Sequence, residues 1–247
     1  MISANLEKLP EKAQKVLKPY MGKLLEIYAN DVLSIFAYGS VTSGDYEPRT
    51  SDINIAVVMK ELSVHTLKRS LGLVRSGIRK GITAPLFLTP DYISMSLDAF
   101  PIEFMNMKDT RLVLLGGDIL ADITVSEGDL RKECEYYLKG KLIALRQAYL
   151  ERALNLRSLE GLLKAALKSL IPVFRNMLRI KTKTAPPVCK VEILNGISKE
   201  FNIDMESFQK VFEAKRAKKR MDKKTAEDAI SSFIDGLQKL SLLVDEI

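Results

Sequence analysis

The sequence is poor in the residues on which several common kinds of site depend. His65 is the only histidine among 247 residues, so serine–histidine–aspartate catalysis and two-histidine metal sites have no support. The two cysteines, Cys134 and Cys189, lie far apart and form no CxxC pair. They therefore offer neither a metal site nor a disulfide framework, and a reducing cytoplasm suits the chain.

Long apolar runs are also missing. No stretch reaches the roughly eighteen uninterrupted apolar residues that a membrane-spanning helix needs. The N-terminus carries Glu7, Pro10 and Glu11 and lacks the apolar centre of a signal peptide. We therefore expect a soluble, cytoplasmic protein that makes no contact with membranes.

The composition is otherwise that of a globular protein with an excess of positive charge. A hydrophobic content of 47% can form a sizeable core in one large domain or two smaller ones. The formal net charge of +7 favours an anionic partner. Lysine and arginine are densest over 215–224, which is a candidate contact for a nucleic acid or a protein. The alternative is a solvated helix end, because no aromatic residue interleaves this cluster to stack on bases.

The first part of the chain mixes helical and strand patterns. Apolar residues recur every three or four positions over 6–27, which predicts a helix that Pro10 and Pro19 should bend or split. The apolar, β-compatible segments 32–38 and 53–59 predict two adjacent strands, separated by a turn-rich segment.

Four shorter elements are expected next. Ser63 is well placed to cap a helix that runs to about residue 80. A short strand over 85–88 and a short helix over 91–98 should follow, and 100–107 is predicted to be the last strand.

After Asp129 the strand patterns stop and helical patterns continue to the end of the chain. The paired prolines within 182–187 predict a loop, and apolar spacing over 226–244 predicts a final amphipathic helix. We place the domain boundary near residue 127. An α+β domain over 1–127 would then precede an all-α helical bundle over 128–247.

The pattern most informative about function spans the first two strands. Gly39 and Ser40 end the first strand, and Asp52 and Asn54 follow after a gap of eleven residues. Successive side chains of a strand point to opposite faces, so Asp52 and Asn54 should project together, as they would at a metal-holding edge. The apolar residues that alternate with them should face the core: Ile53, Ile55 and Val57.

This pattern resembles that of the nucleotidyltransferase superfamily, typified by DNA polymerase beta, kanamycin nucleotidyltransferase and the minimal nucleotidyltransferases. The resemblance implies a small mixed sheet flanked by helices, with a helical domain behind it. It also implies that Gly39 and Ser40 lie against the triphosphate of a nucleotide and that Asp52 holds Mg²⁺ or Mn²⁺. The chemistry agrees, because a glycine lets backbone amides approach phosphate and a serine hydroxyl adds a donor.

One residue departs from the superfamily pattern. Asn54 stands where active members carry a second carboxylate. Its neutral oxygen can act as a metal ligand but contributes no charge. A pair of divalent ions about 3.5–4 Å apart is normally held by carboxylates, so the predicted site is weakened.

Active members also need a third carboxylate, and two positions compete for that role. The segment 85–89 resembles the corresponding strand of the streptomycin adenylyltransferase type, but Phe87 occupies the place of the acid. Alternatively, Glu103 would be the base or a third metal ligand, or else a solvated residue of an edge strand. Asp45 and Glu47, in the loop between the two halves of the motif, can either approach the metal or remain solvated.

The helical half resembles, by architecture alone, the C-terminal domain of antibiotic-type nucleotidyltransferases, which helps to wall the acceptor cleft. That likeness implies that Arg175, Arg179 and 181–183 face the nucleotide.

Two functions from different classes follow from the sequence. The first is an enzyme that transfers a nucleoside monophosphate from a metal-bound nucleoside triphosphate to an unknown acceptor, with release of pyrophosphate. Asp52, Asn54 and Glu103 would form its catalytic and metal site. The second is a degenerate nucleotidyltransferase fold that binds nucleotide or a protein partner for regulation. A nucleic-acid-binding protein that acts through 215–224 is a third reading.

Overall fold

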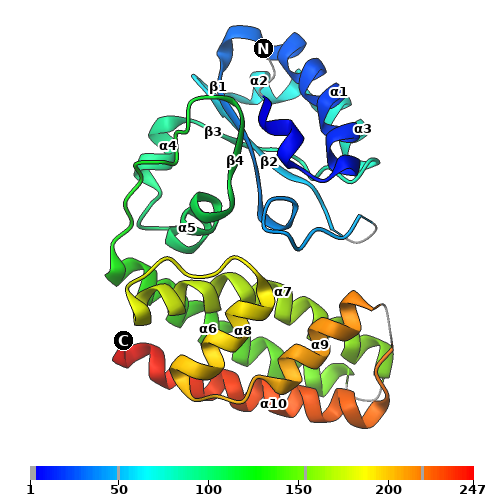
Figure 1. Cartoon of the computed structure of the whole chain (residues 1–247), viewed down its shortest axis with the longest axis vertical. Helices are drawn as coiled ribbons and strands as arrows, with labels where there is room; N and C mark the ends of the chain where they lie inside the picture. Colours follow the sequence, from blue (N-terminus) through cyan, green and yellow to red (C-terminus); the bar gives the residue numbers. More distant parts are fainter. Residues whose placement is uncertain (1–3, 49–50, 153–154, 218–219) are drawn as a thin grey trace. The chain divides into compact units, whose positions relative to one another are not determined.

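The computed structural model describes residues 4–48, 51–152, 155–217 and 220–247 (Figure 1). Contacts between residues divide the chain into two compact units, Met1–Thr124 and Val125–Ile247. The first unit holds the strands, and the second is helical.

A four-stranded mixed sheet organises the first unit. Its strand order is β3-β2-β1-β4. β1 (Val32–Tyr38) lies at the centre and pairs antiparallel with β2 (Asn54–Met59) and with β4 (Leu112–Gly116). β3 (Leu86–Leu88) pairs parallel with β2, because a helical crossover connects the two strands. Both predicted central strands are confirmed.

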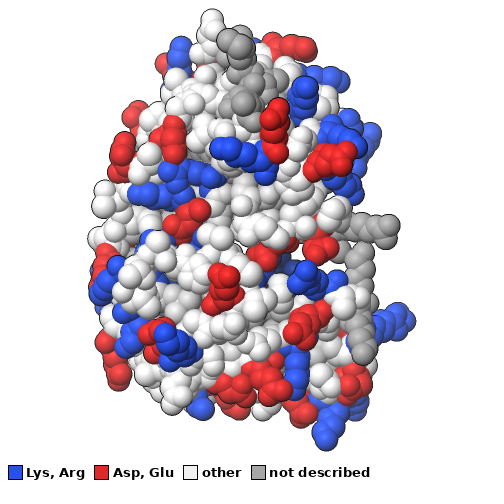
Figure 2. Space-filling model, viewed as in Figure 1, with Lys and Arg blue, Asp and Glu red and all other residues white. Residues whose placement is uncertain are grey.

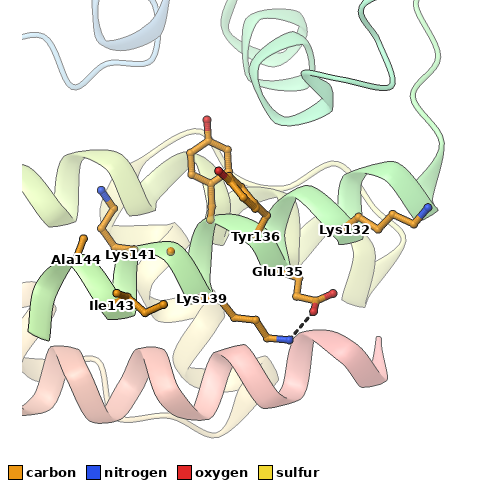
Figure 3. Close-up of a pocket in the computed structure, with 9 residues that line it drawn as sticks. Lys132, Glu135, Tyr136, Lys139, Lys141, Ile143 and Ala144 are labelled. Carbon is orange, nitrogen blue, oxygen red and sulfur yellow. Dashed lines mark hydrogen bonds and ion pairs between the residues drawn. The ribbon is translucent and has the colours of Figure 1, made fainter.

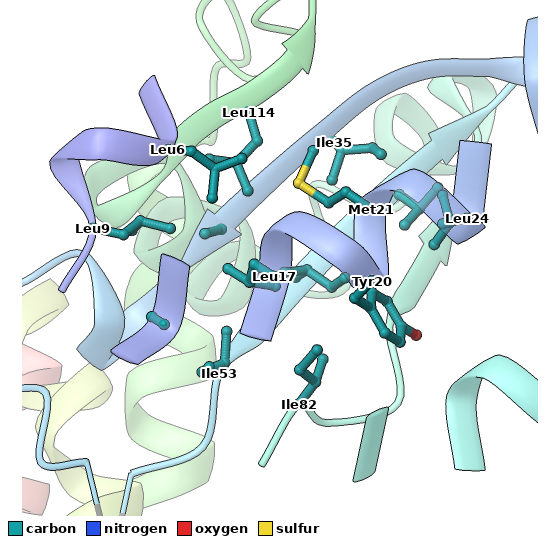
Figure 4. Packing of buried hydrophobic residues seen from close by; sticks show 14 of the residues in the cluster. Leu6, Leu9, Leu17, Tyr20, Met21, Leu24, Ile35, Ile53, Ile82 and Leu114 are labelled. Carbon is teal, nitrogen blue, oxygen red and sulfur yellow. The ribbon is translucent and has the colours of Figure 1, made fainter. Parts of the chain in front are cut away.

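Helices cover both faces of this sheet. α1 (Glu11–Tyr28) packs against one face, where Leu17, Tyr20 and Leu24 meet Ile35 and Ile53 (Figure 4). α4 (Pro90–Met95) and α5 (Pro101–Thr110) contribute to a second apolar cluster on the opposite face. That second cluster is built around a few buried side chains of the sheet and these helices: Phe36, Ala56, Val58, Leu88, Ile93, Phe104 and Met107.

The N-terminal helix is split, as its prolines predict. A 3₁₀ turn, η1 (Ala4–Lys8), precedes Pro10, and α1 begins directly after that proline. Pro19 lies inside α1 without ending it.

The helix expected to run from Ser63 to about residue 80 forms two pieces. Ser63 is its N-cap, since its Oγ accepts a hydrogen bond of 3.1 Å from the backbone N–H of Thr66. α2 (Val64–Lys68) ends after one turn and a half, and α3 (Leu71–Ile78) follows.

The prediction of a strand over 100–107 is wrong. That segment forms α5, and the last strand is β4 further along the chain. Alternating apolar residues at its start resemble a strand, but Pro101 occupies the first turn of a helix, where the fixed φ of proline is favourable. Phe104 and Met107 then lie three residues apart on one buried helical face.

Five α-helices and a final 3₁₀ turn, η4 (Val244–Glu246), make up the second unit as the structure describes it. The α-helices are α6 (Glu127–Arg152), α7 (Leu156–Thr182), α8 (Lys190–Phe201), α9 (Glu206–Arg216) and α10 (Lys223–Leu243). α7 contacts all four others. Its Phe174 packs edge-on against Phe208, which stacks on Phe233 with the ring centroids 3.8 Å apart.

The predicted fold class is confirmed: an α+β region with a small mixed sheet precedes an all-helical region. The loop predicted from the paired prolines lies between α7 and α8. Among the described residues, none of the helices combines the length and the apolar character that crossing a bilayer requires. Both cysteines are free thiols, and burial raises the pKa of Cys134 far above its usual range.

Candidate functional site

A tight turn follows β1 at the position of the Gly-Ser pair. Gly39 opens a short 3₁₀ turn, η3 (Gly39–Val41), with φ at +78°. The carbonyl oxygen of Gly39 accepts hydrogen bonds from the backbone N–H groups of Thr42 and Ser43, both at 3.1 Å. The Thr42 hydroxyl donates to the same oxygen at 2.8 Å, so the turn is closed by several bonds at once.

The start of β2 lies beside this turn because β1 and β2 are antiparallel. Asn54 pairs with Tyr38, the residue just before Gly39. As predicted, the alternating apolar residues Ile53, Ile55 and Val57 are buried, on the face that α1 covers. Asp52 is exposed, two residues before β2 begins, and Asn54 is half-buried.

Asn54 makes contacts on two sides. Its Oδ1 accepts a hydrogen bond of 3.1 Å from the hydroxyl of Thr83. Its Nδ2 lies only 3.2 Å from the point that a β-carbon on Gly39 would occupy. The positive φ and this close approach both favour glycine at position 39.

A second threonine, at the end of α5, also supports the turn. Thr110, buried at the end of α5, accepts a hydrogen bond of 3.0 Å at its Oγ1 from the backbone N–H of Gly39. The same hydroxyl donates to the carbonyl oxygen of Asn106 at 2.7 Å. Thr83 and Thr110 were not expected from the sequence. They lie 29 and 71 residues from their partners, and no local pattern marks them.

The two positions that compete for the third acid lie on different sides of the sheet. Phe87 is paired with Val57 and packs in the α1 cluster, with its ring edge-on to Tyr28 at 5.8 Å. It therefore points away from the face on which Ala56 and the second cluster lie. A carboxylate at position 87 would share the α1 face and not the face of Asn54.

Glu103 lies on a helix rather than on a strand, but that helix covers the face of Asn54. It stands in the first turn of α5, seven residues before Thr110. Residues seven apart in an α-helix share one face, so Glu103 is on the side of α5 that carries the Gly39 contact, about 10 Å further along the axis. Glu103 is half-buried, and one of its carboxylate oxygens is buried.

Tyr38 precedes the turn, and the acids Asp45 and Glu47 follow it in the loop. Tyr38 is half-buried beside Asn54, and burial raises the pKa of its phenol above the ordinary value. In the loop that follows, Asp45 lies 3.5 Å from the Ser43 hydroxyl, and the Glu47 backbone N–H donates to Ser51 Oγ at 3.0 Å. No group of three or more His, Cys, Asp or Glu side chains suited to a metal ion occurs in the part of the chain that the structure describes.

The candidate basic residues of the second unit have separate environments. Arg175 is buried on α7, and Arg179 is half-buried one turn further on. Lys183 ends α7 and forms an ion pair with Glu127.

The 215–224 cluster occupies the end of α9, a connecting segment and the start of α10, where Asp222 is the N-cap. Its residues 218 and 219 lie outside the described residues. Positive and negative side chains are interspersed over the face of the molecule in Figure 2. The described residues of this cluster therefore lie at two helix ends and in the segment between them.

An open hollow in the second unit has lining residues that, among those the structure describes, all belong to α6, such as Lys132, Tyr136 and Ile143 (Figure 3). Lys139 pairs with Glu135 at its edge and with Asp245 at 3.5 Å. Because one helix supplies all of these described lining residues, they do not bring chemical groups from several elements together.

Neither a family model nor a curated protein matches this sequence. The structure is similar to that of the spectinomycin adenyltransferase AAD(9) from Enterococcus faecialis, solved with ATP and spectinomycin. The TM-score is 0.57 at 12% sequence identity, over 91% of this chain and 98% of that chain. At this identity the likeness establishes the fold and not the activity. This chain therefore has the nucleotidyltransferase fold, and a helical C-terminal region follows it in the sequence.

Proposed function

We propose that this protein transfers a nucleoside monophosphate from a metal-bound nucleoside triphosphate to an acceptor, with release of pyrophosphate. The proposal rests on one observation: in a nucleotidyltransferase fold, the Gly39 turn lies beside the start of β2. ATP is the first nucleotide to test, because the similar structure was solved with it.

Gly39 and Ser40 would hold the triphosphate. The glycine lets the backbone approach the phosphates, and Ser40 supplies its hydroxyl and its backbone N–H as donors. The N–H of Gly39 already donates a hydrogen bond to Thr110, so this N–H fixes the turn in position and does not bind phosphate. Preorganised donors of this kind stabilise the charge that develops on the leaving pyrophosphate.

The donor set beside the turn fits one divalent ion better than two. Asp52 is an exposed carboxylate two residues before β2, and Asn54 is neutral. Mg²⁺ commonly binds through one or two carboxylates together with substrate phosphates, which Asp52 and a triphosphate would provide. When bound, such an ion neutralises phosphate charge. Glu103, on the face of α5 that carries Thr110, is the proposed base or further ligand.

The first prediction concerns Asp52. We expect ATP with Mg²⁺ or Mn²⁺ to raise the melting temperature of the protein, and Asp52→Ala to abolish pyrophosphate release and the part of that shift that the metal adds. A ligand at a hundred times its Kd stabilises the folded state by about 2.7 kcal/mol, which is several degrees for a chain of this size.

Asp31→Ala is the matched control for this prediction, because Asp31 lies just before β1, at the end opposite Gly39. It should keep the shift. An Asp52→Ala protein with full activity would contradict the proposed site.

A second candidate function is nucleotide binding without catalysis. The observation that favours it is Asn54, which leaves Asp52 as the one carboxylate of the pair. The two candidates differ in one measurement, the release of pyrophosphate from the four common nucleoside triphosphates with Mg²⁺ or Mn²⁺. A thermal shift without pyrophosphate release under any of these conditions would favour the binding module.

A further inference from the structure

We propose that Asn54 binds a phosphate oxygen as a hydrogen-bond donor instead of binding metal, and that Thr83 is the residue that positions it. This inference rests on the proposed binding of a triphosphate at the Gly39 turn. It predicts a nucleotide site whose affinity depends little on a divalent ion.

In the structure the side-chain amide of Asn54 turns its oxygen toward the hydroxyl of Thr83. That hydroxyl has one proton and two acceptors in reach, Asn54 Oδ1 at 3.1 Å and the Ile53 carbonyl oxygen at 3.4 Å. The nearer acceptor is the amide oxygen of Asn54. With the oxygen bound to Thr83, the NH₂ group points the other way, toward Gly39.

The NH₂ group of Asn54 then lines the turn that holds the phosphates. Nδ2 is the nearest atom to the missing β-carbon of Gly39, at 3.2 Å from its ideal position. A phosphate that approaches the backbone at Gly39 therefore meets an N–H donor at this wall. The oxygen that a metal would need is turned away and already accepts a hydrogen bond.

The charge of the side chain at position 54 determines whether binding of a triphosphate needs a metal ion. A carboxylate at position 54 would repel a triphosphate unless a cation lay between them, whereas an amide attracts phosphate with or without a cation. The wild-type chain has only one carboxylate, Asp52, at the Asp52–Asn54 edge. Its binding of ATP should therefore survive removal of the metal, and a second carboxylate should restore a strict dependence on metal.

Thr83 can be altered without loss of its backbone contact. The N–H of Thr83 donates to the carbonyl oxygen of Ile53 at 3.0 Å, and this bond does not involve the side chain. Thr83→Val keeps the shape and removes only the hydroxyl, whereas Thr83→Ser keeps the hydroxyl. Thr66→Val, in α2 on the α1 side of the sheet, is the matched control for loss of a threonine hydroxyl.

The experiment is calorimetric titration of ATP into the full chain, in EDTA and in Mg²⁺. We expect removal of Mg²⁺ to weaken binding by less than about tenfold in the wild type, and Asn54→Asp to weaken binding in EDTA by about tenfold to a hundredfold. In Mg²⁺, Asn54→Asp should bind at least as tightly as the wild type. Thr83→Val should lose about fivefold in both buffers, with Thr83→Ser and Thr66→Val unchanged.

The outcomes separate this inference from the proposed function. Binding of ATP by the wild type only in Mg²⁺, together with no effect of Thr83→Val, overturns the role of the Asn54–Thr83 pair and leaves the proposed function standing. Absence of ATP binding by every form in both buffers overturns both. A metal-tolerant wild type with a metal-dependent Asn54→Asp variant supports the inference.

Discussion

Gly116 ends β4 in a conformation that no other residue adopts without strain. Its φ is +74°, and a β-carbon there would lie 2.0 Å from the carbonyl oxygen of Leu33. The atom in the way belongs to the backbone of β1, so it cannot rotate aside. The pairing of β4 with β1, which ends at Ser34 and Gly116, requires this glycine.

We predict that Gly116→Ala destabilises the protein by about 3 kcal/mol or more, because the clash and the strained φ act together. Gly117→Ala is the control, since a β-carbon there meets nothing within 4 Å. It should change stability by less than about 1 kcal/mol. The urea midpoint of each variant measures the difference, and equal midpoints would show that β1 yields to the added methyl group.

The residues of the candidate site differ in how far they could be predicted. Gly39, Ser40 and the alternation of polar and apolar residues in β2 follow from local pattern. The orientation of the Asn54 amide does not, because it depends on Thr83, which is brought alongside by the crossover between β2 and β3.

At the scale of elements, α1 and α3 approach each other closely at Gly77. A β-carbon at this buried glycine would lie 2.6 Å from the ring of Tyr20 on α1. Tyr20 is itself fixed in the core, where burial, with a smaller contribution from Tyr28, raises the pKa of its phenol to about 12. The ring therefore has little freedom to move.

We predict that Gly77→Ala costs about 1–3 kcal/mol, since α3 must move away from α1. Gly72, on the same helix, is exposed and has nothing within 4 Å of a β-carbon. Gly72→Ala should instead stabilise the protein by about 0.4–1 kcal/mol, because alanine restricts the unfolded chain. Opposite signs in the shifts of Tm are the expected result, and a destabilised Gly72→Ala would contradict the assigned packing.

The misassigned element shows where pattern fails. The spacing of the first apolar residues of 100–107 is compatible with both a strand and a helix. Pro101 favours the helix, because proline is common in the first turn of a helix. The error had a limited effect on the site. Glu103 moved from a strand to α5, which still covers the face of Asn54.

At the scale of the whole molecule, we propose that the two compact units are separate domains. The unit from Val125 onward includes Ser126, whose Oγ accepts a hydrogen bond of 3.0 Å from the N–H of Asp129 at the start of α6. A fragment cut before Val125 therefore keeps the cap of its first helix.

We predict that fragments 1–124 and 125–247 each fold alone. Each has its own buried core, so each should unfold cooperatively with temperature, and 125–247 should show a strongly helical circular dichroism spectrum. Gradual, non-cooperative melting of either fragment would show that it depends on the other, and a mixture of both fragments would then be expected to recover the transition.

The local sequence pattern was sufficient to predict the two central strands, the cap at Ser63 and the helical second half, and to locate the Gly-Ser motif. Each of these depends on residues close together in the sequence, whose steric and hydrogen-bonding preferences act before the chain folds. Folding was needed to bring Thr110 to Gly39, to turn Phe87 toward α1 and to orient Asn54. These contacts join residues far apart in the sequence, and their geometry is decided by how sheet and helices pack.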